Sequence, residues 1–436
     1  APGSTFSVNL TLQNSTQNVV GDSITPPRAG TYTSSGIPLP QNNTIASVNN
    51  CRLMYGGSEI PAQFKPLSRR GDLDDSSKPL EWILATFQIP SVPSNYTLEC
   101  GSSINQSAQS ATPLTITQND GSYFTINTGP GVFKIAKTNP TSANSYPIFD
   151  QVTVNGQQII TPGTNTGLRM RAKDDINGTS FYNFQPTGFT LIESGPLRAI
   201  IEITGSFNNG LSNSLNATLR LTFFAGKAEV VQRVILENNL TGGEPYPPNQ
   251  GSVPSPAHFK ELSMVMNPVL TGSQTVGFDG ETYVSPTQDI FYTQRSLPAD
   301  KQKPWHNALV QTPSDSSPGN LLDNFYTKTY QNGSVISQAI QTRALGSGRI
   351  TGTGGSIGIG LDYFWETNPK DLFAGQNKLG ASLFPGNNLT SAEYTYEPYF
   401  RTNVPSGTSD PNWNNSSQLS QSVDPETINL ASPNDT

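Results

Sequence analysis

The sequence predicts an all-β fold, and three observations support it. Apolar and polar residues alternate with period two in several segments, which is the pattern of half-buried strands. Helical periodicity is not sustained for more than two or three turns anywhere in the 436 residues. The chain also contains 39 Gly and 35 Pro beside many Ser, Thr and Asn, a composition typical of short strands joined by many turns.

Individual strands can be placed by this alternation. Residues 5–12 put Phe6, Val8, Leu10 and Leu12 on one face and polar side chains on the other. Residues 197–203 and 219–223 repeat the pattern. The segment 225–227, Ala-Gly-Lys, has the composition of a turn, so residues 215–237 are predicted to form a hairpin.

Changes in composition suggest three regions. A Ser-, Gln- and Ala-rich stretch at 101–113 separates two strand-rich parts, so we expect an N-terminal β-barrel domain at 1–112 and a larger β domain at 113–400. Residues 401–436 form a polar tail with few apolar residues. Such a tail buries too little apolar surface to order alone. We therefore expect it to pack on a neighbouring copy, with Trp413 and Leu419 as assembly residues. Residues 5–12 are the competing segment for this role, unless they form the opening strand of the subunit's own barrel.

The chain carries few charges and many glycosylation motifs. Only 13% of its residues are charged, about half the usual ~25%. Thirteen Asn-x-Ser/Thr sequons, several of which an Asn-rich chain produces by chance, could carry glycans that make up for the missing charged surface. The acceptor residues are Asn9, Asn14, Asn42, Asn95, Asn105, Asn177, Asn216, Asn239, Asn332, Asn388, Asn414, Asn415 and Asn434. We expect most of them to be modified and exposed, with Asn414 and Asn415 competing for one glycan.

The remaining composition is that of an extracellular protein. The two cysteines, Cys51 and Cys100, are predicted to form a disulfide, whose loop of about 50 residues would contribute about 4 kcal/mol in the chain-entropy model; two unpaired buried thiols are the alternative.

A net charge of −7 without basic runs argues against nucleic acid and anionic membranes as partners. We find no stretch of ~18 apolar residues, so no membrane span is expected. The chain opens Ala-Pro-Gly-Ser, as a mature secreted protein would.

Residues able to carry catalysis are scarce. His258, in a Pro-rich segment, and His306 have no recognisable partner and are predicted to be loop or packing residues. The acidic groups at 72–75 and 174–175 are interpreted as turn carboxylates, because neither fits a calcium loop. The glycines at 352–360 are interpreted as turn and barrel-corner residues. Eight aromatic residues could include a platform that stacks on sugars, but core and interface packing is the preferred interpretation. They are Trp305, Tyr363, Phe364, Trp365, Tyr394, Tyr396, Tyr399 and Phe400. No cofactor, metal site or catalytic residue is expected.

Several short segments together resemble the secreted exo-rhamnogalacturonan lyase-like family. Ile60-Pro61-Ala62-Gln63 is similar to its V-P-x-Q motif, and Leu67-Ser68-Arg69 to L-S-R-W, with Arg70 in place of Trp. Further resembling segments are Gly36-Ile37-Pro38-Leu39-Pro40, Pro79-Leu80-Glu81-Trp82-Ile83-Leu84, Ser194-Gly195-Pro196-Leu197-Arg198-Ala199, Arg220 to Gly226, Tyr363 to Lys370, and Leu383-Phe384-Pro385. The resemblance implies an N-terminal barrel followed by a β-supersandwich.

In that family a helical catalytic toroid follows these two domains. After Phe400 this chain has a polar tail instead, so we expect no lyase activity. The leading hypothesis is a secreted, N-glycosylated structural protein that binds copies of itself in an extracellular filament or surface layer. The alternative is a carbohydrate-binding, noncatalytic relative of a polysaccharide lyase. An active glycan-cleaving enzyme is the weakest of the three.

Overall fold

The structure is a computed structural model that describes most of the first 400 residues. The described residues are 5–12, 28–92, 94–117, 121–138, 146–172, 181–207, 215–237, 257–284, 286, 288–296, 325–331, 334–340, 344–362, 364, 370–384 and 399–400. Within them the fold is all-β and antiparallel, which confirms the predicted class. The single helical element in the described part of the chain is a short 3-10 helix, η1 (Val48–Asn50).

The N-terminal unit consists of two small sheets around one core. One sheet has the order β1 (Phe6–Leu12), β7 (Ser94–Cys100), β3 (Cys51–Tyr55), β4 (Ser58–Ile60). The other has the order β2 (Tyr32–Pro38), β6 (Leu80–Gln88), β5 (Ala62–Arg69). Leu53, Leu98 and Ile83 are fully buried between them, and the alternate apolar residues of β1 pack against the same core, as their spacing predicts.

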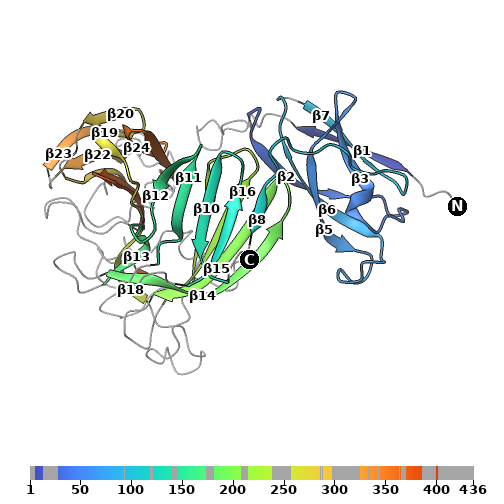
Figure 1. The fold of residues 1–436 in the computed structure, drawn as a ribbon, viewed down its shortest axis with the longest axis horizontal. Coiled ribbons are helices and arrows are strands. Elements are labelled where there is room, and N and C mark those ends of the chain that lie inside the picture. Colours follow the sequence, from blue (N-terminus) through green and yellow to red (C-terminus); the bar gives the residue numbers. More distant parts are fainter. Residues whose placement is uncertain are drawn as a thin grey trace, which may run out of the picture.

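The second part is built on one large sheet of twelve strands (Figure 1). Its order is β17 (Val230–Glu237), β16 (Asn216–Phe224), β15 (Arg198–Phe207), β14 (Phe181–Ser194), β13 (Gly167–Ala172), β18 (Ala257–Met266), β27 (Lys378–Phe384), β26 (Lys370–Gly375), β21 (Ile290–Ser296), β22 (Phe325–Gln331), β23 (Ser334–Ile340), and β28 (Tyr399–Phe400) pairs with β18. The hairpin predicted at 215–237 is formed by β16 and β17.

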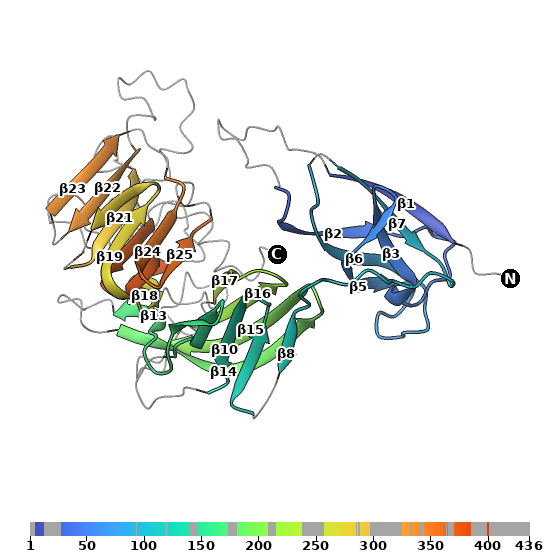
Figure 2. The same cartoon turned by 45° about the horizontal axis from the view of Figure 1, so that its top comes forward.

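Two smaller sheets cover separate halves of the large one (Figure 2). The five-stranded sheet has the order β12 (Gln157–Ile160), β11 (Phe149–Val154), β10 (Gly131–Ala136), β9 (Tyr123–Asn127), β8 (Thr115–Thr117). The four-stranded sheet has the order β20 (Glu281–Val284), β19 (Thr271–Phe278), β24 (Ser347–Thr353), β25 (Gly355–Gly360). Each half has its own core, one around Phe133 and Phe223 and the other around Phe278 and Tyr292.

Two further sequence interpretations can be checked against the backbone. Gly352 pairs with Gly355 across a tight turn at Gly354, whose φ of 91° suits glycine, so Gly354 is a turn glycine as predicted. The other glycines at 352–360 lie within β24 and β25. His258, predicted to lie in a loop, is instead the second residue of β18 and pairs with Tyr399. The Pro-rich composition before it pointed to a loop, but the strand begins directly after the last of those prolines.

Candidate functional site: a cleft at the domain junction

The N-terminal unit meets the sandwich through the edge strand β5 and the turn between β14 and β15. The chain connects the two parts through residues 101–113, which contain no strand. Leu114 then donates its backbone N–H to the Pro196 carbonyl at 2.8 Å and enters the sandwich core. At the other side of the junction Tyr32 of β2 stacks on Phe224, with ring centroids 4.9 Å apart, and donates its hydroxyl to the Ala225 carbonyl.

Gln63 of β5 joins the two parts through its side-chain amide. Its Oε1 accepts the backbone N–H groups of Leu197 at 2.9 Å and Arg198 at 2.8 Å. Its Nε2 donates to the Arg198 carbonyl and to Oε1 of Glu193. The amide therefore uses both donors and both acceptor positions, and it bonds to the β14–β15 turn much as a strand backbone would.

An ion pair lies directly beside this amide. Arg198 donates Nε to Glu193 Oε1 at 2.9 Å and Nη2 to Oε2 at 2.7 Å, a bidentate geometry. Its remaining nitrogen, Nη1, donates to Ser34 Oγ, and that hydroxyl shares a hydrogen bond with Thr86. Gln63, Glu193 and Arg198 are each only 8% exposed. We call Ser34, Gln63, Thr86, Glu193 and Arg198 the junction cluster; it joins β2, β5 and β6 to β14 and β15.

Gly195 makes room for this cluster. A Cβ at Gly195 would overlap the amide group of Gln63. The backbone of the β14–β15 turn therefore approaches β5 as closely as it does because position 195 has no side chain. Gln63 and Arg198 of the cluster come from Ile60-Pro61-Ala62-Gln63 and Ser194-Gly195-Pro196-Leu197-Arg198, two of the segments that carried the family resemblance. The structure assigns their residues a role in joining domains.

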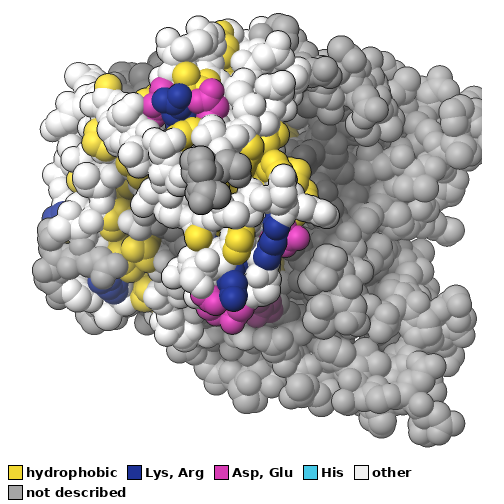
Figure 3. Space-filling model, turned by 90° about the vertical axis from the view of Figure 1, so that its right-hand side faces the viewer, with side chains coloured by type: hydrophobic (Ala, Val, Ile, Leu, Met, Phe, Trp, Pro, Cys, Tyr) yellow, Lys and Arg dark blue, Asp and Glu magenta, His cyan; other side chains and the backbone are white. Residues whose placement is uncertain are grey.

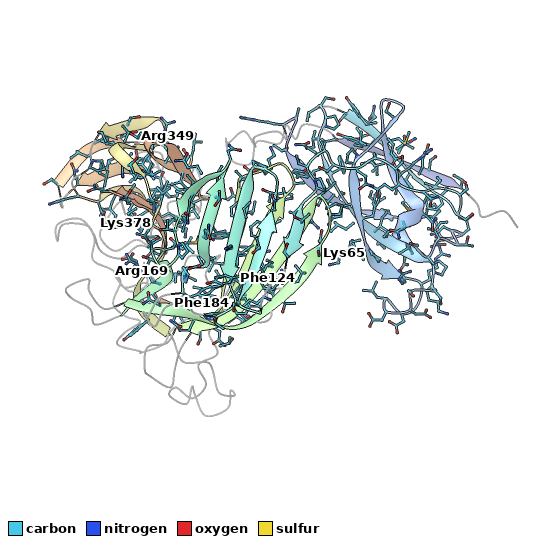
Figure 4. The ribbon with its side chains drawn as sticks, in the orientation of Figure 1. Lys65, Phe124, Arg169, Phe184, Arg349 and Lys378 are labelled. Atoms are coloured by element: carbon cyan, nitrogen blue, oxygen red, sulfur yellow. A yellow bond between two sulfur atoms is a disulfide. The ribbon has the colours of Figure 1, made fainter. Side chains whose placement is uncertain are left out.

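A cleft of about 420 Å³ opens next to the junction cluster. Lys65, which Figure 4 labels between the two parts of the molecule, lies on one wall. The lining is formed by β5, the connecting segment and the β14–β15 turn, and includes the amides Asn49, Gln106 and Gln109, the hydroxyls Ser110 and Ser194, and the apolar residues Pro61, Phe64, Pro66, Ile192 and Pro196. Gln109, Ile192 and Ser194 are exposed and available to a ligand.

Glu193 is the only carboxylate among the described residues that line the cleft. Both of its oxygens accept hydrogen bonds, from Arg198 and Gln63. Glycoside hydrolysis uses two carboxyl groups placed on either side of the bond to be cut. The described lining offers amide hydrogen bonds, one lysine and apolar contacts, with which a polar ligand can be bound.

The predicted disulfide is present. Cys51 and Cys100 are bonded, and they lie directly opposite each other on β3 and β7. Both are fully buried in the core of the N-terminal unit.

Five of the thirteen sequons fall on described residues. Asn9, Asn42, Asn95 and Asn105 are exposed, as expected, whereas Asn216 at the start of β16 is only partly exposed. The other eight acceptors lie outside the described residues, as do Trp413 and Leu419. The predicted assembly through 401–436 therefore stays a prediction.

The arginines at 69–70 and the acidic residues at 72–75 make hydrogen bonds within the N-terminal unit. Arg69 donates to the carbonyls of Ala46 and Lys78, both at 2.7 Å, and Arg70 to that of Pro40. The carboxylates of Asp72 and Asp75 accept backbone hydrogen bonds within their own turn, as predicted. No group of His, Cys, Asp or Glu able to hold a metal occurs among the described residues. Nor does the described part of the chain contain a helix long and apolar enough to span a membrane.

Among the aromatic residues considered for sugar stacking, Phe364 is the one whose side chain the structure describes. It is buried in the second sandwich core and stacks on Tyr292, with ring centroids 6.2 Å apart. Its role is core packing, the preferred interpretation. The cleft has no signature in the sequence, because the amides and prolines at 61–66, 106–110 and 192–197 form no motif until the fold brings them together.

Comparison with known proteins adds no assignment. No family model matches the chain, and no curated protein matches its sequence. The resemblance to the lyase-like family therefore stays a prediction, and the functional argument rests on the geometry of the cleft.

Proposed function

We propose that this chain is a secreted, N-glycosylated protein that binds carbohydrate noncatalytically in the cleft at the domain junction. The observation that carries the proposal is the lining of the cleft. It combines amide side chains with exposed apolar surface, and its one carboxylate is engaged in the junction cluster.

The lining matches the chemistry of a sugar. A saccharide presents hydroxyls that both donate and accept hydrogen bonds, and Asn and Gln amides do the same in fixed directions. The apolar C–H faces of a sugar ring require apolar partners, which Phe64, Ile192 and Pro196 provide. Small-ligand sites occur preferentially between domains and have volumes of about 300–1,000 Å³, so a cleft of 420 Å³ is of suitable size.

The junction cluster supports binding by fixing the walls. Ligand affinity is lost when a site must be ordered as the ligand arrives. Here β5 and the β14–β15 turn are held together by the amide of Gln63 and the ion pair of Arg198. The walls that contain Lys65 and Ile192 are therefore in place before a ligand binds.

Secretion is supported by two features of the described residues. A buried disulfide forms and persists in oxidising compartments. The face of the N-terminal unit shown in Figure 3 is mainly uncharged, and most of its charged side chains lie in small groups of mixed sign. Glycans on the exposed Asn9, Asn42, Asn95 and Asn105 would give this surface the solubility that charge usually provides.

The proposal is tested by measuring binding of the purified protein to an immobilised panel of plant and microbial polysaccharides. The double variant Ile192→Ser, Gln109→Ala removes one apolar and one amide contact from exposed cleft positions. We expect it to lower affinity by about tenfold or more while leaving the fold unchanged.

Val231→Ser is the matched control, because Val231 is an exposed apolar residue on β17, which does not line the cleft. It should bind as the unsubstituted protein does. Binding that the two cleft substitutions leave unchanged, or no binding to any member of the panel, would contradict the proposal.

A further inference from the structure

Three sequons lie together on one face of the N-terminal unit. Asn9 is on β1 and Asn95 is on β7, and both are exposed on the outer face of the sheet β1-β7-β3-β4. Asn105 follows β7 in the connecting segment and lines a surface hollow with Ser7 and Glu99 of the same sheet. This sheet is therefore the part of the described structure in which glycan acceptors are most concentrated.

The sequons on β1 and β7 lie side by side on two antiparallel strands, so each runs opposite to the other. Asn9 pairs with Thr97, and Thr11 pairs with Asn95. Thr11 donates its hydroxyl to Asn95 Oδ1 at 3.1 Å, and Thr97 donates to Asn9 Oδ1 at 3.4 Å. Each sequon hydroxyl thus bonds to the asparagine of the other sequon. The two asparagines are diagonal neighbours, a relation that separates residues by about 7–8 Å in antiparallel pairs.

The third sequon is held in a similar way. Ser107, the hydroxyl residue of the Asn105 sequon, donates both its backbone N–H and its Oγ to the Glu59 carboxylate, each at 2.7 Å. Asn42 differs, because it is exposed in a turn and Thr44, its hydroxyl residue, is exposed as well. No hydrogen bond of the Thr44 side chain occurs within the described structure.

We infer that Asn9, Asn95 and Asn105 can receive glycans only before the N-terminal unit folds, whereas Asn42 remains an acceptor afterwards. The inference rests on the proposed secretion. A glycosyltransferase that recognises Asn-x-Ser/Thr must engage both the asparagine amide and the hydroxyl two residues later. In the folded sheet the hydroxyls of Thr11, Thr97 and Ser107 are already bonded, and β1 is paired with β7 along its whole length.

The folded sheet nevertheless accommodates the glycans once they are attached. Transfer joins Asn Nδ2 to the anomeric carbon of a lipid-diphosphate-linked oligosaccharide, breaks the bond from that carbon to the diphosphate oxygen, and releases the lipid diphosphate and one amide proton. The cross-strand bonds use Oδ1 of Asn9 and Asn95. Within the described structure Nδ2 of neither residue makes a hydrogen bond, so the glycan and the strand pairing use different atoms.

The test supplies the aglycosylated full-length chain to a purified oligosaccharyltransferase with its lipid-linked donor. The chain is presented once folded and oxidised and once reduced and unfolded, and occupancy at each sequon is read by glycopeptide mass spectrometry. We expect Asn42 to be modified in both forms. Modification of Asn9, Asn95 and Asn105 should be at least about tenfold lower in the folded form, since Asn9 and Asn95 require local opening of the sheet and Asn105 requires release of Ser107 from Glu59.

A Val8→Ala variant sharpens the test by weakening the packing of β1 on its core. It should raise acceptance at Asn9 and Asn95 in the folded protein and leave Asn42 unchanged. Equal modification of Asn95 in the folded and unfolded forms would overturn the inference. Absence of glycan from Asn42 and every other sequon of the native protein would instead contradict the proposed N-glycosylation, because that result does not depend on the order of folding and transfer.

Discussion

The two sheets of the N-terminal unit use similar polar residues for different purposes. In the sheet β2-β6-β5, which faces the sandwich, Gln63 is buried and its hydrogen-bonding capacity is used within the protein. In the sheet β1-β7-β3-β4, the amides of Asn9 and Asn95 are exposed. Where water is excluded, the amide of Gln63 fixes the domain junction. Where water has access, the amides of Asn9 and Asn95 are accessible to the proposed glycosylation.

The ion pairs of the two sheets differ in the same way. Arg198–Glu193 has side chains 10% and 7% exposed, whereas Arg52–Glu99 on the outer sheet has 36% and 29%. Removing one partner of a buried pair leaves an uncompensated charge, while an exposed charge is stabilised by water. Stability should therefore depend strongly on the first pair and weakly on the second.

The largest effect is expected from Arg198→Met. It leaves the Glu193 carboxylate buried beside Gln63, so the variant should lose about 3–5 kcal/mol of the free energy of unfolding. This loss can be measured by urea-induced unfolding that is monitored by hydrogen exchange. Arg52→Met is the matched control and should cost no more than about 1 kcal/mol. Equal costs for the two variants would remove the distinction between the sheets.

Loss of the disulfide should come next. A Cys51→Ala, Cys100→Ala variant frees a loop whose ends are 49 positions apart, and the expected cost is about 2–4 kcal/mol. The bond lies inside the N-terminal unit, so hydrogen-exchange protection should fall in β3 and β7 and change little in β15 and β16. An equal loss of protection in both parts would indicate that the junction couples them into one unfolding unit.

Gly195→Ala should have a smaller effect confined to the junction. The new methyl group would displace the Gln63 amide, leaving the Leu197 and Arg198 N–H groups without their acceptor, at a cost of about 1–3 kcal/mol. Gly360→Ala is the control, because a Cβ there meets no neighbouring atom and its φ is not positive. If Gly195→Ala is as stable as the control, Gln63 does not depend on the space that Gly195 leaves.

The smallest effect concerns pH. Burial raises the pKa of Glu59, but hydrogen bonds from the Ser107 hydroxyl and the Ala108 and Ser107 amides, together with Arg52, outweigh it and lower the pKa from its ordinary value of 4.5. Because folding lowers this pKa, the contribution of Glu59 is present above the ordinary value and is lost as pH falls through the folded value. Proteolysis between residues 101 and 113 should therefore increase at acidic pH, and Glu59→Gln should be cleaved readily at every pH.

The sequence predicts the positions of the strands better than it predicts which of their residues form the domain junction. Alternation placed Leu197, Ala199, Ile201 and Ile203 on one face, and all four are buried, because burial on one side imposes period two directly. The cysteine pair was also predictable, since two cysteines in an oxidising compartment have one possible partner each.

The junction cluster could not be derived in this way. Gln63 and Arg198 are 135 positions apart, and their contact follows from how two sheets dock rather than from any local pattern. The same limit applies to His258, whose local sequence indicated a loop although pairing with Tyr399 makes it part of a strand.

Hydrogen exchange of the glycosylated protein, with and without a soluble polysaccharide selected from the binding panel, tests the central claim most directly. The account predicts protection in 61–66, 106–110 and 192–197, the three segments that line the cleft, with no change in β1 or β7. Protection confined to β1 and β7, or spread evenly over the surface with none in these three segments, would contradict the assignment of the cleft as the binding site.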